Sequence, residues 1–551
     1  MRLFVVFGAL LLPWLNPIAS GPSPSALPSL IAALCTGLAV LWVRPRAVLG
    51  LVALFFIALC AGLAGASGGF TQELLASWQA LGMLWLCAAM GAQALATRPL
   101  AQWVAWAWLL AALISSVFAL LQYAGWAHHF APFISASAGG EAYGNLRQRN
   151  QMATLTCIGV AALLYLQNTN ATKFAARQAL SACAAALLLL ANAVTASRTG
   201  LTQLLLLLCL AWLWRAGLPV ALRRLLWLAL PLYALGAWLL PWLKGVALGN
   251  AVLRIAHEDT GCGSRLVLWS NVWDLIAQKP WLGWGWRELA WAHYQTHFAP
   301  RFCQILDNAH NLPLHLAVEL GLPVATAVCA VLLYALWRGK PWREANPLRQ
   351  LAWSVLLCIG LHSLVEYPLW YGPFQMASGL AVGLLWASRP GQRVRTEEKS
   401  PVMPYLYAFA AIILVASSAW VAYDYHRVSQ MYLPLGQRSS AYREDTLRKI
   451  GSSLLFHNQL EFARLSVTPL TPNTAAQQRA LAVQLLHYSP EPRVIEVLIE
   501  SASLMGDVSA ASAEARRYQE AFPNDYAQWR AKQLLAGMAA PALAASAVPA
   551  Q

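Results

Sequence analysis

The stretch 405-YLYAFAAIILVASSAWV-421 carries no charged side chain over 17 residues, about the length that an α-helix needs to cross a bilayer. Comparable uncharged runs occupy 47–63 and 201–214. Of the 551 residues, 59% are hydrophobic and only 11% are charged, so the chain has more apolar surface than a soluble core holds. These runs are apolar on all sides, which indicates helices and not the alternating strands of a barrel.

Working outward from these runs, the sequence predicts an all-α polytopic membrane protein with about 12 or 13 transmembrane helices. The first helix is the uncertain one, because Arg2 before an apolar run that ends in Ile18-Ala19-Ser20 is also typical of a cleavable signal peptide. The predicted spans are 3–19, 28–43, 47–65, 78–96, 101–124, 150–167, 176–196, 201–214, 225–243, 311–337, 350–366, 372–388 and 404–423.

The formal net charge of +15 follows the predicted topology. Basic residues gather in alternate connections, which places those connections in the cytoplasm and the intervening ones, with the C-terminal tail, outside it. Basic patches interleaved with aromatic residues are missing, so nucleic acid is not an expected partner. The basic clusters are Arg44 with Arg46, Arg98, Lys173 with Arg177, Arg215 with Arg223 and Arg224, Arg338–Arg349 and Arg389–Lys399.

Two domains are predicted, a membrane domain over 1–423 and a tail over 424–551. Within the first, the loop 244–310 outside the cytoplasm is too long to be a simple connector. The tail contains amphipathic stretches and helix stops at Ser489-Pro490 and Phe522-Pro523, which suggest paired, tetratricopeptide-like helices. Beyond about residue 538 the Ala- and Pro-rich end is expected to be disordered.

Eight of the ten cysteines fall in apolar runs, where a thiol behaves as a small hydrophobe. Cys262 and Cys303 instead share the long external loop, where a disulfide can form. We therefore predict a bond between these two.

Polar residues at the ends of membrane helices are costly and mark candidate sites. The first external cluster, Glu141–Gln151, places Arg147, Arg149, Asn150 and Gln151 before a span, although a polar collar at a helix start explains it equally well. The second is Ser197-Arg198-Thr199-Gly200. A cation on the outer side goes against the positive-inside tendency and needs an anion, either a ligand or a lipid phosphate.

The third cluster begins at Gly263-Ser264-Arg265, with Trp269 one turn later on the same helix face. Guanidinium groups bind phosphate oxygens in a bidentate way and keep their charge, which suits them to a diphosphate. In the same loop, Gly283-Trp284-Gly285 belongs to a tryptophan-rich segment that is suited to stacking on sugars or to lying at the lipid surface.

The fourth cluster, Asp307–Pro313, places His310 and Asn311 just outside a span, where an imidazole can accept a proton near neutral pH. A further segment, His362–Tyr371, provides Glu366, Tyr367 and Tyr371 where another span ends. His293 and His297 have the spacing of a metal-binding pair, but no carboxylate or cysteine completes the set, so no metal is expected.

In their order, on one predicted side of the membrane, these motifs resemble those of the O-antigen ligase and O-antigen polymerase superfamily. They are most similar to its protein-modifying branch, the pilin-type O-oligosaccharyltransferases. The resemblance spans most of the chain and rests on residues 143–151, 197–200, 263–265, 280–285, 307–311 and 362–371.

The resemblance implies a reaction at the periplasmic face of a bacterial inner membrane, without metal or cofactor. A preassembled oligosaccharide would pass from a polyprenyl (undecaprenyl) diphosphate carrier to a Ser or Thr hydroxyl of an acceptor protein such as a pilin. Arg198 and Arg265 would bind the diphosphate, and His310 would position or deprotonate the hydroxyl. The substrate-binding residues would be Arg147, Arg149, Asn150, Gln151, Trp284, Asn311, Glu366, Tyr367 and Tyr371.

Other functions stay open. Other branches of the superfamily transfer the glycan to lipid A core or to a growing polysaccharide. A transporter or flippase would also have a dozen spans, but its charges should lie near the midplane. A scaffold that uses the tail to recruit partners leaves the external Arg and His residues unexplained.

Overall fold

A computed structural model describes the chain except for residues 1, 19–20, 24, most of 47–71, 97, 138–139, 170–174, 244–261, 389–400 and 536–551. Most of the predicted span 47–65, the first part of the loop 244–310 and the expected disorder after 538 therefore lie outside the described residues.

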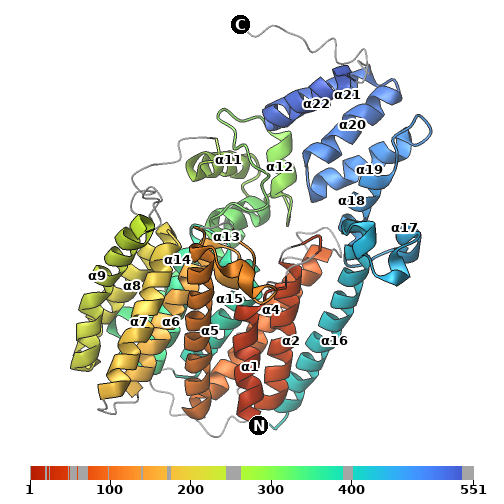
Figure 1. Ribbon diagram of the computed structural model, residues 1–551. Coiled ribbons are helices and arrows are strands. Elements are labelled where there is room, and N and C mark those ends of the chain that lie inside the picture. Colours follow the sequence, from red (N-terminus) through yellow and green to blue (C-terminus); the bar gives the residue numbers. More distant parts are fainter. Residues whose placement is uncertain are drawn as a thin grey trace. The chain divides into compact units, whose positions relative to one another are not determined.

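Every regular element in the described residues is a helix, which confirms the all-α part of the predicted fold class (Figure 1). The tetratricopeptide-like character of the tail remains a prediction. Seven helices are long and apolar enough to cross a membrane, and the chain is a multi-pass membrane protein. The total of 12 or 13 spans and their orientation remain predictions. The seven are Ala26–Val43, Leu74–Ala94, Pro99–Ala124, Arg149–Thr169, Leu222–Leu240, Leu312–Arg343 and Met403–Tyr432.

The chain forms two compact units. Unit 1 comprises Met1–Gly62, Leu75–Glu258 and Leu332–Ala422, and unit 2 comprises Leu63–Leu74, Asp259–Val331 and Tyr423–Gln551. Three of the described helices continue from one unit into the other: α4 (Gln72–Ala96), α13 (Leu312–Gly339) and α16 (Met403–Ser429).

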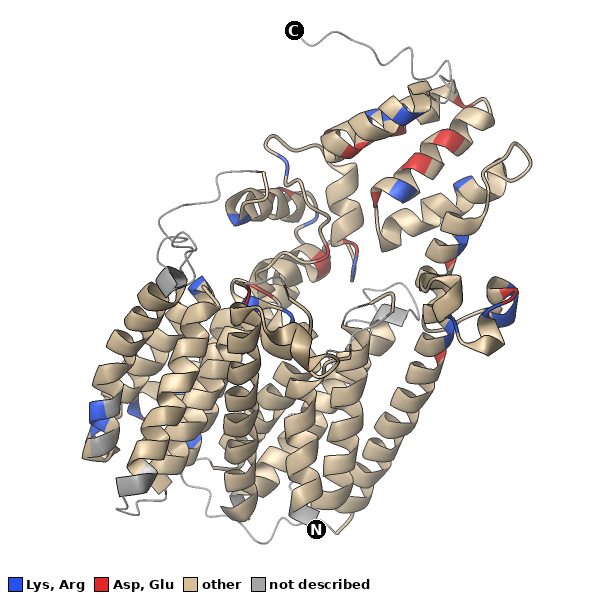
Figure 2. Cartoon of the chain, viewed as in Figure 1, with Lys and Arg blue, Asp and Glu red and all other residues tan. Residues whose placement is uncertain are grey.

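Unit 1 is a bundle of apolar helices whose Lys and Arg residues lie mainly at helix ends (Figure 2). In a membrane the hydrophobic effect does not drive helices together, so their association depends on close packing of small residues at the interface. A Cβ on Gly379 would lie 2.5 Å from the Leu84 carbonyl oxygen, and one on Gly383 would lie 1.9 Å from that of Ala88. The Gly-x-x-x-Gly spacing thus brings two helix backbones together. The helices are α1 (Arg2–Leu15), α2 (Ala26–Val43), α4 (Gln72–Ala96), α5 (Arg98–Ala124), α6 (Arg149–Thr169), α7 (Ala175–Val194), α8 (Arg198–Leu213), α9 (Val220–Leu243), α14 (Pro347–Ser363) and α15 (Gly372–Ala387).

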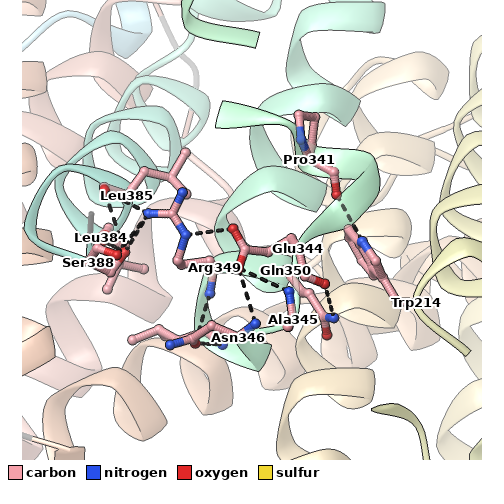
Figure 3. Close-up of polar contacts among 11 residues, drawn as sticks. Trp214, Pro341, Glu344, Ala345, Asn346, Arg349, Gln350, Leu384, Leu385 and Ser388 are labelled. Carbon is pink, nitrogen blue, oxygen red and sulfur yellow. Dashed lines mark hydrogen bonds and ion pairs between the residues drawn. The ribbon is translucent and has the colours of Figure 1, made fainter. Parts of the chain in front are cut away.

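A buried ion pair organises one end of this bundle, in the connection before α14 (Figure 3). Arg349 Nε donates to Glu344 Oε2 at 2.6 Å, and its Nη1 donates to the Ser388 carbonyl oxygen at 3.1 Å. The guanidinium thereby satisfies a carbonyl at the C-terminus of α15, where a helix leaves acceptors without intrahelical donors. The Trp214 indole donates to the Pro341 carbonyl oxygen at 2.8 Å and joins the end of α8 to the same connection.

Unit 2 combines the described part of the long loop with the C-terminal tail. The loop contributes α11 (Arg265–Gln278) and α12 (Leu289–Gln295). Tyr294 of α12 is only 3% exposed among apolar side chains of the tail, and its hydroxyl donates to Glu514 at 3.0 Å. The predicted helix stops are confirmed, because α19 ends at Tyr488 and α21 at Ala521. The tail helices are α17 (Thr446–Ile450), α18 (His457–Val467), α19 (Ala475–Tyr488), α20 (Pro492–Leu504), α21 (Val508–Ala521) and α22 (Pro523–Leu535).

The span predicted over 311–337 is interrupted, because Gly321 has non-helical backbone angles (φ 83°, ψ 162°) and Pro323 follows. In a continuous helix, the carbonyls of Val318 and Glu319 would accept from residues 322 and 323, but a proline has no N–H. The loop replaces both donors. Trp284 N donates to Val318 O at 2.8 Å, and Gly285 N donates to Glu319 O at 3.0 Å.

We call these backbone hydrogen bonds between the loop and α13 the interlock. It also includes a bond in the opposite direction, in which Leu322 N donates to the Pro280 carbonyl oxygen at 2.8 Å. The two segments approach so closely that a Cβ on Gly321 would lie 2.1 Å from Trp281 O, and one on Gly283 would lie 2.5 Å from Glu319 O. This contact explains the glycines of Gly283-Trp284-Gly285 by backbone geometry alone.

We predict that Gly321→Ala destabilises the protein by about 3 kcal/mol or more, because it adds steric overlap to the cost of a positive φ. Gly506→Ala is the matched control, since Gly506 also has a positive φ (78°) but open space around its Cβ position. It should cost only about 1–2 kcal/mol. Thermal unfolding of the purified variants, followed by tryptophan fluorescence, measures both; equal losses would contradict the interlock.

Candidate functional site

Three of the predicted motifs meet through hydrogen bonds in unit 1. Asn150 Nδ2 donates to Glu366 Oε1 at 3.0 Å, and Gln148 Nε2 donates to Oε2 of the same carboxylate at 3.3 Å. Ser197 Oγ donates to Asn150 Oδ1 at 2.7 Å. Glu366 is only 6% exposed, so these polar groups form a shared cluster at the starts of α6 and α8 and just after the end of α14.

The Ser-Arg sequences at 197–198 and 264–265 form the same local structure, a helix N-terminus that is capped by a serine side chain. Ser197 caps α8 by accepting from Gly200 N at 2.9 Å, and Ser264 caps α11 by accepting from Val267 N at 3.3 Å. In each case the arginine is the first helical residue and is exposed. A cation at a helix N-terminus faces the positive end of the dipole and costs about 0.3–1 kcal/mol, so helix stability does not explain its presence. Backbone N–H groups and a guanidinium at one place are suited to an anion.

Gln151 lies in the first turn of α6 and is 1% exposed. Neither its amide nitrogen nor its amide oxygen has a hydrogen-bond partner within the described part of the chain. A buried amide without partners costs free energy, and in a native structure it marks a candidate ligand contact. Gln151 therefore keeps its predicted role as a proposal.

Arg147 and Arg149 have partners of their own. The Arg147 guanidinium donates to the Pro17 carbonyl oxygen, and Arg149 pairs with Glu141 at 3.0 Å. Arg147 also adopts a positive φ of 58°. Both side chains thus help to hold the 141–149 segment.

Tyr367 and Tyr371 lie after the end of α14, with ring centroids 6.0 Å apart and nearly parallel planes. Both are half-buried close in sequence to Glu366, so this segment adds two phenols to the side of unit 1 that carries Asn150 and Ser197.

Sequence reasoning did not predict a second polar layer, which lies deeper in the same helices. Thr154 Oγ1 lies 2.9 Å from His362 Nδ1, and Gln203 Nε2 donates both to Thr154 Oγ1 at 2.9 Å and to the Cys358 carbonyl oxygen at 2.8 Å. All of these side chains are buried. The sequence did contain a sign of this layer, because Thr154, Gln203 and His362 each interrupt an apolar run. A polar residue in such a run costs free energy unless it finds a polar partner.

In unit 2, the structure fixes His310 through its backbone. His310 N donates to Asn308 Oδ1 at 2.8 Å, and the residue adopts a φ of 50°, in the left-handed region that few residues other than glycine adopt. Asn311 Oδ1 accepts from Leu314 N at 3.0 Å and caps α13. His310 therefore stands, half-buried, directly before a capped helix N-terminus.

The helix of Arg265 contacts the segment of His310. The Trp269 indole Nε1 donates to the Ala309 carbonyl oxygen at 3.1 Å, next to His310. Arg265 precedes Trp269 by four residues, about 6 Å along α11. Two of the three predicted catalytic residues thus lie on contacting elements of one unit, whereas Arg198 belongs to unit 1.

Trp284 has a packing role in the structure. Its indole donates to the Leu275 carbonyl oxygen at 2.9 Å, and the Lys279 ammonium lies 4.0 Å from its ring centroid. The sugar contact predicted for this ring remains a proposal.

Cys262 and Cys303 form a disulfide with their Cα atoms 5.4 Å apart. It closes a segment that contains α11 and α12. Closing a loop of that length stabilises a chain by about 4 kcal/mol in the chain-entropy model.

His293 and His297 point to different partners and do not share a site. His293 Nε2 lies 3.2 Å from Asn271 Oδ1, whereas His297 Nδ1 lies 2.9 Å from Glu520 Oε2 in the tail. His293 is 4% exposed, and Arg301 Nη2 lies 3.5 Å from its Nδ1. Burial first, and the Arg301 charge second, lower the pKa of His293 to about 3.

Three known families match successive parts of the chain. Residues 142–166 match protein glycosylation ligases, 183–329 match the O-antigen ligase family, and 350–536 match the C-terminal region of virulence factor membrane-bound polymerases. Every motif described above lies wholly or mainly in one of these segments. The chain is an O-antigen ligase-like membrane protein.

Two relatives from Acinetobacter baylyi extend this similarity. A general O-oligosaccharyltransferase is 27% identical over 378 residues, which cover 65% of this chain and 63% of the relative. A ComP-specific O-oligosaccharyltransferase is 24% identical over 285 residues, which cover 51% of this chain and 50% of the relative. The O-antigen ligase-like chain thus spans between half and two thirds of the relatives it matches.

We predict that His293 makes unit 2 sensitive to acid. The unfolded chain binds a proton at this residue below its ordinary pKa near 6.5, whereas the folded chain does so only near 3. Stability should therefore fall with pH between these values, by up to about 1.4 kcal/mol per pH unit.

Thermal unfolding of wild type and His293→Gln at pH 7.5, 6.0 and 4.5 measures this effect. The variant should be less stable at pH 7.5 but should lose less on acidification. His457→Gln, a surface change in the tail, should keep the wild-type slope. Parallel curves for wild type and His293→Gln would rule out the assignment.

Proposed function

We propose that this chain transfers a preassembled oligosaccharide from a polyprenyl diphosphate carrier to a Ser or Thr hydroxyl of a protein. The observation that carries this proposal is that Arg198 and Arg265 each open a serine-capped helix, while His310 stands before a third capped helix. Helix N-termini with added guanidinium groups favour a diphosphate, and the imidazole provides a base. The names of both A. baylyi relatives support oligosaccharide transfer.

In the proposed reaction, the acceptor hydroxyl oxygen attacks the anomeric carbon of the first sugar. The bond from that carbon to the phosphate oxygen breaks, and polyprenyl diphosphate leaves with the electron pair. The hydroxyl proton passes to the His310 imidazole. Arg198 and Arg265 stabilise the negative charge that develops on the leaving group, a task that fixed positive groups perform well. We propose that they make a metal ion unnecessary.

We propose substrate-binding or supporting roles for the remaining predicted residues. Gln151 would use its unpaired amide for a substrate, and Glu366 would hold Asn150 in place through the bond observed between them. Asn311, Tyr367, Tyr371, Trp284, Arg147 and Arg149 would line or support the site. We place it at the periplasmic face of a bacterial inner membrane, where lipid-linked glycans are presented.

A second candidate acceptor follows from the family matches, since 183–329 match O-antigen ligases and 350–536 match membrane-bound polymerases. Lipid A core or the glycan itself would then receive the oligosaccharide. Incubation with lipid-linked oligosaccharide and all three acceptors distinguishes these functions by which one gains mass. A transporter or flippase would give no product of increased mass.

We predict that His310→Ala lowers transfer by about a hundredfold or more, because a positioned base contributes roughly that much. Donor binding should persist, since the diphosphate contacts are kept. The assay is the mass increase of an acceptor protein in lipid nanodiscs, with and without a metal chelator, which should have no effect. His457→Ala is the control histidine, and full glycosylation by His310→Ala would refute the role.

Donor affinity tests whether the two arginines act on one ligand. Arg198→Gln and Arg265→Gln should each weaken donor binding by about 10- to 100-fold, which corresponds to the loss of a hydrogen bond to a charged group. If both arginines bind one diphosphate, the double variant should depart from the product of the single effects. Additive losses would indicate two separate sites.

A further inference from the structure

The turn that interlocks with α13 exposes two large apolar side chains. Trp281 is 74% exposed and Leu282 is 84% exposed. Their backbone is well held, because Gly283 N donates to the Lys279 carbonyl oxygen at 3.2 Å and Leu322 N donates to that of Pro280 at 2.8 Å. The exposure is therefore a property of a fixed turn.

The helix that leads into this turn has an exposed apolar face of its own. Leu266 and Trp273 are 64% and 60% exposed, and their spacing of seven residues places them on one side of α11. We call the four exposed side chains of this helix and turn, Leu266, Trp273, Trp281 and Leu282, the loop apolar patch. The four side chains are aliphatic or indole groups without a formal charge.

The turn of the patch is hydrogen-bonded to the start of a stretch that could cross a membrane. Leu322, which donates to Pro280, begins the second part of α13, and that part belongs to a candidate membrane span. Leu322 and Val324 are each 38% exposed, and Val331 is 51% exposed further along the same helix. The interlock thus places the exposed turn beside an exposed apolar stretch of a candidate membrane span.

We propose that the loop apolar patch inserts into the lipid surface and anchors the loop at the membrane interface. Trp residues favour this interface because one part of the ring is apolar and the N–H is polar. Lys279, which is exposed and precedes Trp281 by two residues, adds a positive charge near the patch that lipid phosphates would favour. An amphipathic segment with Trp and Leu on one face is a common form of interfacial anchor.

Lipid contact fits the patch better than a sugar or a protein does. Sugar recognition needs hydrogen-bonding groups around the stacked ring, whereas the four side chains of the patch offer only two indole N–H groups. Its continuity with a span places lipid next to it without a further partner. This inference does not depend on the proposed transfer reaction.

The test uses a photo-crosslinking amino acid, benzoylphenylalanine, at Leu282, Trp273 or Leu266 of the full chain. The chain is held in nanodiscs of phosphatidylethanolamine and phosphatidylglycerol. Leu504 in the tail is the control position, because it is also large, apolar and 47% exposed. After irradiation, mass spectrometry identifies the adducts. We expect lipid adducts at the patch positions about tenfold above the control, as for an interfacial segment.

Lipid adducts at the level of the Leu504 control would overturn the proposal, as would adducts mainly to a second copy of the chain. Three patch positions guard against a variant that fails to fold. Because the readout is an adduct mass, failure of the anchor and failure of glycan transfer are measured separately.

Discussion

The backbone hydrogen bonds of α13 set the strongest constraint on this structure. Within or beside a membrane, an unsatisfied carbonyl costs several kcal/mol, so a helix can break only where another segment provides donors. Gly321 and Pro323 break α13, and the amides of Trp284 and Gly285 take over two carbonyls. The glycine motif of the long loop follows from this requirement, and so does the fixed position of the loop along the helix.

A second constraint concerns charge at helix ends. A helix N-terminus carries partial positive charge and attracts anions. An arginine placed there is repelled by that charge, but it adds a second positive group for an anion to bind. Unit 1 and unit 2 each contain this arrangement, at Arg198 and at Arg265. Under the proposed function, each of these helix starts would bind a negatively charged group of the donor.

The sequence was sufficient for the helical class and for the ends of α19 and α21, because each depends on local periodicity or on turn residues. Its candidate motifs also contained Asn150, Ser197 and Glu366, which the structure joins by hydrogen bonds. It did not predict the break at Gly321, since Gly and Pro are tolerated within apolar runs and only the loop reveals their use. The Thr154–His362 contact was also missed. The sequence shows which polar residues are buried in apolar runs, but not which of them meet across three helices.

The contact between loop and tail was equally hidden, and it changes the role that the tail can have. Tyr294 follows Gly285 by nine residues, packs among tail side chains and bonds to Glu514. His487 adds a second link, because its Nδ1 lies 2.8 Å from Glu288 Oε2. The loop that carries Arg265 and His310 is therefore built into the same unit as α18–α22. Under the proposed function, a protein that binds the tail would therefore be bound to the same unit as the proposed base, His310.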